Sequence, residues 1–436
     1  MRRLIVTAAA TALAVSAFAG STAAQDDVRL RVLAHQNPPF VEFMEAFNAQ
    51  FEADNPGVTV DMAVVPAGEI LTSTQTRLTA NDVDVIDIFA FHNRAQPYME
   101  GTIPPGWQTL IEGGLLMDIT DQPFVDNYDP VSIAEAGSFD DRVYAVNLGR
   151  IAFSGIFVND DMLADNGLET PTTWSELVAT CEALGEAGIP CMSVGGKDQW
   201  PVFVGSYGLM GANYPDQAAA VESIWTREAQ YTDQDWLDLM AKYQIYSRDM
   251  IEPGAGGIPA DGAPGRFVSG AVAMLPGGMW YAPAIEDTMA DFGMEFEWSY
   301  IPFPGSDDVA NNQFLFGKYD QGWAIAENSP NKDAALAYVS AFSEPENYQE
   351  FVNAVGFIPT QPTATLDTKL GEDIAPYIDT FQIAWELIWK DPPGTMGTLA
   401  NVPQVNLFKP FGEFDDVQAA AEKAQADLDS GLDALE

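Results

Sequence analysis

Hydrophobic and polar positions switch between a two-residue period and a helical period along the first part of the chain. Residues 28–34 (VRLRVLA) alternate like a strand, residues 40–51 space their apolar side chains like a helix, and residues 58–65 alternate again. Asn55-Pro56-Gly57 ends the helix between the two strands. The pattern therefore predicts a β-α-β unit, the start of a mostly parallel sheet.

The same alternation of strand and helix returns along the rest of the chain. Residues 71–79 fit a helix, and residues 83–91 and 143–158 read as strands. Thr173-Trp174-Ser175-Glu176 is a capping box that opens a helix to about residue 186, and a strand is expected at 191–194. Ser329-Pro330 predicts another helix start, with the helix running to about residue 341. We expect an α/β fold, and 436 residues suggest two or three domains.

The first residues have the pattern of an export signal. Arg2 and Arg3 precede an uncharged, mostly apolar stretch at 4–18, and small residues at 21–24 resemble a cleavage site. We therefore expect residues 1–24 to be a cleavable signal peptide. No Cys follows the apolar stretch, so no lipid anchor is expected there, and the mature protein should be free in a periplasm or in the medium.

The chain is strongly acidic, with 19 Lys plus Arg against 64 Asp plus Glu. Without Arg2 and Arg3 the mature chain has 17 basic residues and a formal charge of −47. Such a charge repels phosphate backbones and anionic lipid, which argues against nucleic acid and membrane surfaces as partners. Two His and two Cys fit no zinc motif, and we expect no metal and no cofactor.

The two cysteines, Cys181 and Cys191, join the end of a predicted helix to the strand after its turn. An even number of Cys in an exported chain predicts a disulfide, and two buried free thiols are the alternative.

Three stretches that contain Gly or Pro, at residues 144–149, 300–305 and 354–359, are candidate crossings between two lobes. If the chain crosses three times, each lobe is discontinuous and the crossings form the floor of a cleft and its hinge. The alternative is three ordinary turns, because such residues punctuate any α/β protein.

The run from 155 to 196 resembles a segment of the family 1 extracellular solute-binding proteins of ABC importers. In that family, a strand ending in Asn and an acidic or basic residue precedes a Gly-Leu-x-x-Pro-x-Thr-Trp-x-Glu helix start, seen here at 167–176. Further similar segments cover essentially the whole mature chain. The resemblance implies a two-lobed periplasmic binding protein fold with three interlobe crossings and a ligand cleft. It places one lobe at 25–145 plus 302–353 and the other at 146–301 plus 354–436.

The same resemblance implies a function. Members of the family capture a solute, most often a sugar, by closing their lobes, and deliver it to the permease subunits of an ABC transporter. We therefore expect a monomer that binds a carbohydrate or a related polyhydroxylated solute and does no chemistry.

Aromatic side chains are the first candidates for sugar contacts, because the C–H faces of a pyranose pack against aromatic rings. Trp280 follows a Gly-Gly-Met run that includes Gly278, where the family usually places a stacking Trp. Trp200 lies in a loop where maltodextrin-binding relatives place a stacking aromatic residue, and Trp323 follows the second predicted crossing. The alternative for each Trp is packing in a core or on the surface.

Polar candidates lie beyond the carboxyl ends of the predicted strands, at the start of the second predicted helix or just past the first crossing. They are His35, Gln36, Asn37, Glu69, His92, Asn93 and Arg150. Asn93 stands where maltodextrin-binding relatives have a sugar-binding carboxylate, which argues against a maltodextrin as the ligand. Arg150 leaves an anionic sugar open. A buried His92 and a surface Arg150 paired with a carboxylate are the alternatives.

An exported carbohydrate-active enzyme, or a lectin without a transporter, would also be rich in aromatic and acidic residues. A glycosidase needs two carboxyl groups ~5 to 9.5 Å apart, and 64 acidic residues single out no such pair. No Gly-x-Ser-x-Gly elbow, His-Glu-x-x-His motif or P-loop occurs in the sequence. Asp82, Asp84 and Asp87 lack the glycine and terminal Glu of a calcium loop.

Overall fold

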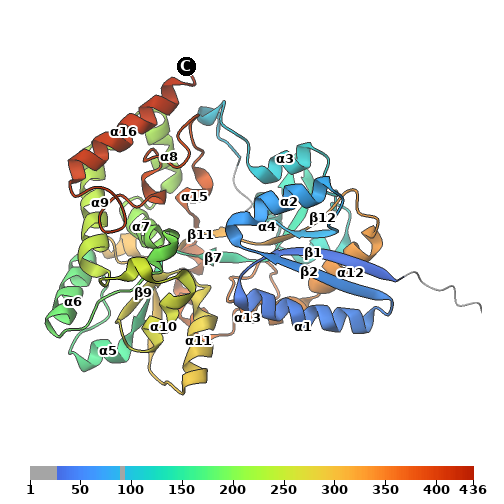
Figure 1. The fold of residues 1–436 in the computed structure, drawn as a ribbon, viewed down its shortest axis with the longest axis horizontal. Helices are drawn as coiled ribbons and strands as arrows, with labels where there is room; N and C mark the ends of the chain where they lie inside the picture. Colours follow the sequence, from blue (N-terminus) through green and yellow to red (C-terminus); the bar gives the residue numbers. More distant parts are fainter. Residues whose placement is uncertain (1–26, 89–93) are drawn as a thin grey trace, which may run out of the picture.

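The computed structural model describes residues 27–88 and 94–436. Two lobes lie side by side and are joined through strands in the middle of the molecule (Figure 1). The predicted signal peptide and the segment that contains His92 and Asn93 lie outside the described residues. Within the described ranges, no helix has both the length and the apolar character needed to cross a membrane.

The first lobe is built on a five-stranded sheet with the order β2-β1-β3-β12-β6. β1 is parallel to both β2 and β3, while β12 is antiparallel to both β3 and β6. The predicted β-α-β unit is confirmed, because α1 connects the parallel pair β1 and β2. The bounds of these elements are β1 Val28–His35, α1 Pro38–Asp54, β2 Val58–Val65, β3 Val85–Asp87, β6 Ala145–Asn147 and β12 Gly322–Ile325.

Helices cover both faces of this sheet (Figure 1). On one face α1, α12 and α13 enclose a cluster of aromatic rings, in which Phe342 and Phe351 have centroids 5.0 Å apart. On the other face Trp107 of α3 packs with Leu33 and Ile86 of the sheet. Burial on both faces agrees with the uninterrupted buried positions of β3, β6 and β12. The helices are α2 Ile70–Thr79, α3 Gly106–Glu112, α4 Pro130–Ala136, α12 Lys332–Phe342 and α13 Pro345–Val355.

The second lobe has a three-stranded antiparallel sheet with the order β10-β8-β9. Its helices enclose a large core that includes Trp236, Trp385 and Met240, all almost fully buried. The strands are β8 Gly155–Asn159, β9 Met274–Gly277 and β10 Trp298–Pro302. The helices are α5 Asp160–Asp165, α6 Trp174–Glu186, α7 Trp200–Asn213, α8 Gln217–Trp225, α9 Gln234–Ile245, α10 Ala263–Val268, α11 Tyr281–Phe292, α14 Lys369–Ile374, α15 Trp385–Ile388 and α16 Val417–Asp433.

A third sheet, with the order β13-β11-β7, lies between the two lobes. β7 (Arg150–Ala152) directly follows β6 of the first lobe, and β11 (Phe316–Tyr319) directly precedes β12. β13 (Gln382–Ile383) pairs with β11. Ile358, in the third predicted crossing, exchanges two backbone hydrogen bonds of 2.9 Å with Arg150.

The second crossing differs from the prediction. Residues 300–305 stay with the second lobe, because β10 pairs with β8 and Phe303 packs in the second-lobe core. We therefore propose that the chain crosses at β11, up to Gln321, and not at 300–305.

Of three further predicted elements, one helix start is confirmed and two strands are not found as predicted. The capping box is confirmed, since the Thr173 side chain accepts from the Glu176 amide and the Glu176 side chain accepts from the Thr173 amide. The single strand predicted at 143–158 is wrong, because the chain changes sheets there and forms β5 (Arg142–Val143), β6, β7 and β8. The strand predicted at 191–194 is reduced to isolated bridges of Met192.

The predicted disulfide is present. Cys181 in α6 is bonded to Cys191, with Cα atoms 5.0 Å apart, and both residues are buried in the second-lobe core. A loop of this length contributes ~2 to 3 kcal/mol in the chain-entropy model.

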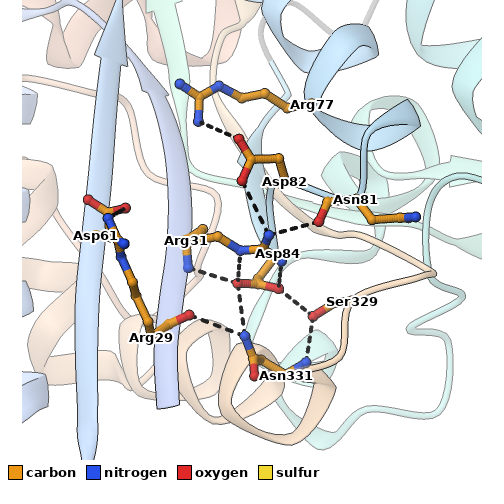
Figure 2. Close-up of polar contacts among 9 residues, drawn as sticks. All are labelled: Arg29, Arg31, Asp61, Arg77, Asn81, Asp82, Asp84, Ser329 and Asn331. Atoms are coloured by element: carbon orange, nitrogen blue, oxygen red, sulfur yellow. Dashed lines mark hydrogen bonds and ion pairs between the residues drawn. The ribbon is translucent and has the colours of Figure 1, made fainter. Parts of the chain in front are cut away.

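The buried carboxylate of Asp84 connects several segments at the end of the first-lobe sheet where β1 begins (Figure 2). Asp84 is fully buried and accepts from Arg31 Nε at 3.0 Å and Nη2 at 2.8 Å. It also accepts from Ser329 Oγ at 2.7 Å and Asn331 Nδ2 at 3.2 Å. These contacts join β1, the segment before β3 and the segment that leads into α12, so Asp84 links three parts of the first lobe.

Candidate functional site

Polar side chains meet where the first-lobe strands end. His35 is the last residue of β1, Asp87 is the last residue of β3, and Gln321 directly precedes β12. His35 Nδ1 lies 2.6 Å from Asp87 Oδ2, and Gln321 Nε2 lies 3.1 Å from His35 Nε2. All three side chains are buried. Because neighbouring strands bring their ends together, residues far apart in sequence form one polar cluster.

A second charged group continues this cluster along the crossing strand. Lys318 of β11 and Asp320 form a buried ion pair with Nζ and Oδ1 3.0 Å apart. The charge of Glu386, on α15 of the second lobe, also acts on Lys318. The crossing cluster, which we define as His35, Asp87, Lys318, Asp320, Gln321 and Glu386, thus includes residues of both lobes and of the crossing between them.

Burial and charge compete in setting the pKa values of this cluster. Burial acts to lower the pKa of His35, but the charge and hydrogen bond of Asp87 outweigh it and raise that pKa above 6.5. Burial also acts to lower the pKa of Lys318, yet Asp320 and Glu386 raise it overall. Burial raises the pKa of Glu386, and Lys318 only partly offsets this effect. The carboxylates of the cluster therefore favour the protonated, charged forms of His35 and Lys318.

Two acceptor atoms of the cluster are left for another partner. Within residues 27–88 and 94–436, neither Asp87 Oδ1 nor Gln321 Oε1 accepts a hydrogen bond, although both atoms are buried. A buried acceptor without a donor is costly, so water or a ligand hydroxyl group would be favoured at these atoms.

Two of the predicted aromatic residues come together in the second lobe. The ring centroids of Trp200 and Trp280 are 5.9 Å apart, with an angle of 55° between their planes. Trp200 begins α7 and is 37% exposed. Trp280 is partly buried and packs against core clusters of both lobes, so it lies at their junction.

Gly278 makes room for the ring of Trp280. A Cβ atom built on Gly278 would lie 1.9 Å from Cζ3 of that ring, a distance that no packing tolerates. Any side chain at 278 would therefore displace the Trp280 ring. Sequence reasoning selected Gly278 as a place where backbone approaches a ligand, and the contact found here is with the neighbouring indole.

Trp323 lies elsewhere. It is fully buried in the first-lobe core and packs against Phe40 and Phe342, with centroids 5.9 Å from each. A ring without exposed surface cannot stack on a sugar in this conformation, so the core-packing alternative describes Trp323, and we leave it out of the proposed site.

The remaining predicted polar residues are dispersed. Gln36 is exposed, and Asn37 precedes α1 without capping it by its side chain. Glu69 is exposed at the end of a short 3-10 helix, Ala67–Glu69. Arg150 is partly buried with its guanidinium 5.1 Å from the centre of the Phe381 ring. In the part of the chain that the structure describes, none of these four residues forms a hydrogen bond or an ion pair with the crossing cluster, and His92 and Asn93 lie outside that part.

Sequence reasoning missed most of the crossing cluster. A signal was present at 318–321 (KYDQ), where charged and amide residues interrupt an otherwise apolar stretch. Charges inside an apolar stretch indicate either a turn or a buried pair, and Lys318 and Asp320 form such a pair. Glu386 carries no comparable local signal.

A separate cavity of about 620 Å³ lies beside this region. It is lined by Gln96 and Tyr98, which precede α3, by residues at and near the start of α8, and by residues of β13 and α15. Neither Trp residue of the pair lines it.

The chain matches the model of the bacterial extracellular solute-binding protein family over residues 35–349. This match covers most of the chain, and the protein belongs to that family. A protein of Brucella abortus (strain 2308), described as a binding protein, is 22% identical over 80% of this chain and 78% of its own length.

Solved structures show the same two-lobed fold. RafE in complex with raffinose has a TM-score of 0.75 at 20% identity, over 93% of this chain and 100% of that chain. A chitin oligosaccharide binding protein has a TM-score of 0.72 at 19% identity, over 94% of this chain and 100% of that chain. A sugar transporter protein from Bacillus licheniformis in complex with stachyose has a TM-score of 0.65 at 14% identity, over 92% and 95%. At these identities the likeness establishes the fold.

Proposed function

We propose that this protein is the solute-binding subunit of an ABC importer and that its ligand is a carbohydrate or a related polyhydroxylated solute. The observation that carries the proposal is a pair of accessible indole rings, Trp200 and Trp280, at the junction of a two-lobed fold whose strand ends carry a polar floor. Family membership and the sugars in the names of structural relatives support it. No observation favours an enzyme or a lectin over this function.

The mechanism we propose is capture by closure of the lobes. Ligand C–H faces would pack on Trp200 and Trp280. Asp87 Oδ1 and Gln321 Oε1 are buried in this conformation, so they would accept from ligand hydroxyl groups only after the lobes separate. A ligand that contacts both lobes stabilises the closed arrangement, which the permease subunits would then bind. No metal or cofactor takes part in this mechanism, and the subunit would act as a monomer.

A ligand screen tests the proposed function. The mature protein is mixed with neutral oligosaccharides and monosaccharides, uronic acids, polyols, amino acids and peptides, and its melting temperature is measured. A ligand at 100 times its Kd stabilises the folded state by about 2.7 kcal/mol, so at least one neutral carbohydrate should raise the melting temperature by several degrees. Stabilisation by amino acids or peptides alone would contradict the proposal.

We also propose that the protein is exported to the periplasm with residues 1–24 as a cleaved signal peptide. The positively charged start, the apolar stretch and the small residues before Gln25 support this proposal. The mature chain should begin at Ala24 or Gln25, which the intact mass of the exported protein measures. A mass that still includes Met1 to Ala23 would contradict cleavage at this site.

A further inference from the structure

Residues 94–105, which lead into α3, contact both lobes. Their middle part includes a short 3-10 helix, Pro97–Met99, which contacts α8 of the second lobe. Met99 is fully buried and belongs to the second-lobe core cluster, and Tyr98 packs against the same cluster. In Figure 1 this light-blue segment runs at the top of the view, away from the crossing strands and close to α16. We refer to residues 94–105 as the strap.

Both ends of the strap are fixed to the first lobe. Arg94 Nη1 lies 3.2 Å from Asp140 Oδ1, and the Arg94 guanidinium lies 4.1 Å from the centre of the Phe139 ring. At the other end Trp107 is buried in the first-lobe core. The strap is therefore a first-lobe loop whose middle is held by the second lobe.

The strap also packs closely against the C-terminal part of the chain at Gly101. Gly101 has a φ of +92°, and a Cβ atom there would lie 2.8 Å from Cδ2 of Leu435 near the end of the chain. Burial, together with the nearby charge of Glu222 on α8, raises the pKa of Tyr98. A left-handed backbone and direct contact with Leu435 together favour glycine at 101.

We propose that the strap is a latch between the lobes, in which Met99, seated in the second-lobe core, limits how far the lobes can separate. Withdrawing Met99 exposes an apolar side chain to water, which opposes opening. While Met99 stays seated, Arg94 and Met99 are five residues apart and can separate by no more than about 17 Å. This restraint acts in addition to the three crossings, and it is independent of which ligand the protein binds.

The cavity of about 620 Å³ lies between Tyr98 of the strap and the start of α8. The strap is thus packed tightly at Met99 and loosely beside it. This arrangement allows the residues beside Met99 to move while Met99 stays buried in the second-lobe core.

Small-angle X-ray scattering of the protein without ligand tests the latch. Met99→Ser should shift the lobes toward the open arrangement by about tenfold to a hundredfold, seen as a larger radius of gyration. Met240→Ser is the matched control, because Met240 is equally buried in the same core cluster but lies on α9, within the second lobe. The control should lose stability and keep the wild-type radius of gyration.

A second variant covers the case in which Met99→Ser does not fold. Replacing residues 96–103 by a Gly/Ser segment of equal length keeps the covalent connection and removes the anchor, and it should also enlarge the radius of gyration. An unchanged radius in the variants that fold, or an equal increase in Met240→Ser, would overturn the latch. Once a ligand is known, its dissociation should be about tenfold faster or more from the anchorless variants. Because the scattering needs no ligand, its outcome is independent of the proposed function.

Discussion

Trp280→Ala is expected to weaken carbohydrate binding by about 30-fold or more, since truncating a central Trp at a binding surface costs about 2 kcal/mol or more. Trp280 is the aromatic residue that packs against the core clusters of both lobes, so its ring would contact the ligand where the lobes meet. Isothermal titration of the ligand found in the screen measures the loss. Trp280→Phe keeps an aromatic face and should retain part of the affinity.

Two further variants separate a binding role of Trp280 from a role in stability. Gly278→Ala leaves the indole in the chain but forces its ring out of place, so it should also weaken binding. Phe292→Ala, at the end of α11 with a 76% exposed side chain, should change nothing. Unchanged affinity in folded Trp280→Ala and Gly278→Ala proteins would remove Trp280 from the site.

Elements with local signals were predicted well. The helix opened by Thr173 and Glu176 forms as predicted, because a capping box needs only four consecutive residues. The helix predicted from Ser329-Pro330 begins two residues late, at Lys332. Ser329 Oγ still accepts from the Asn331 backbone amide at 2.9 Å, as a cap does, and its hydroxyl also donates to Asp84, 245 residues away in sequence. The local pattern predicts the first contact but not the second.

The candidate site was predicted only in part, for a related reason. Trp280 and Trp200 each follow a glycine-containing loop, and the structure brings them together. Trp323 also follows a crossing, but α1 and α12 cover its strand, a long-range fact that no local pattern encodes. The pair of His35 and Asp87 depends on the register of β1 and β3, which pairs Leu33 with Ile86 and so places the two strand ends together.

Asp84→Ala is expected to lower the free energy of unfolding by about 3 to 5 kcal/mol, because removing one partner of a buried pair leaves the other uncompensated. Arg31, 20% exposed, would lose its bidentate partner, and Ser329 and Asn331 would lose an acceptor (Figure 2). The matched control is Asp61→Ala, which removes a pair with Arg29 that is largely exposed, and should cost ~1 kcal/mol or less. Urea denaturation at pH 7 measures both changes.

The same carboxylate gives the prediction a pH dependence with a definite sign. Burial acts to raise the pKa of Asp84, but hydrogen bonds from Arg31 and Ser329 outweigh it and hold this pKa below its ordinary value of 3.8. A carboxyl group with a lowered pKa in the folded state contributes stability that is present above the unfolded pKa and is lost as pH falls through the folded pKa. The wild-type protein should therefore lose this contribution below about pH 4, whereas Asp84→Asn, which cannot ionise, should show a shallower loss of stability over the same range. Parallel acid titrations of the two proteins would show instead that Arg31 and Ser329 do not stabilise the ionised form.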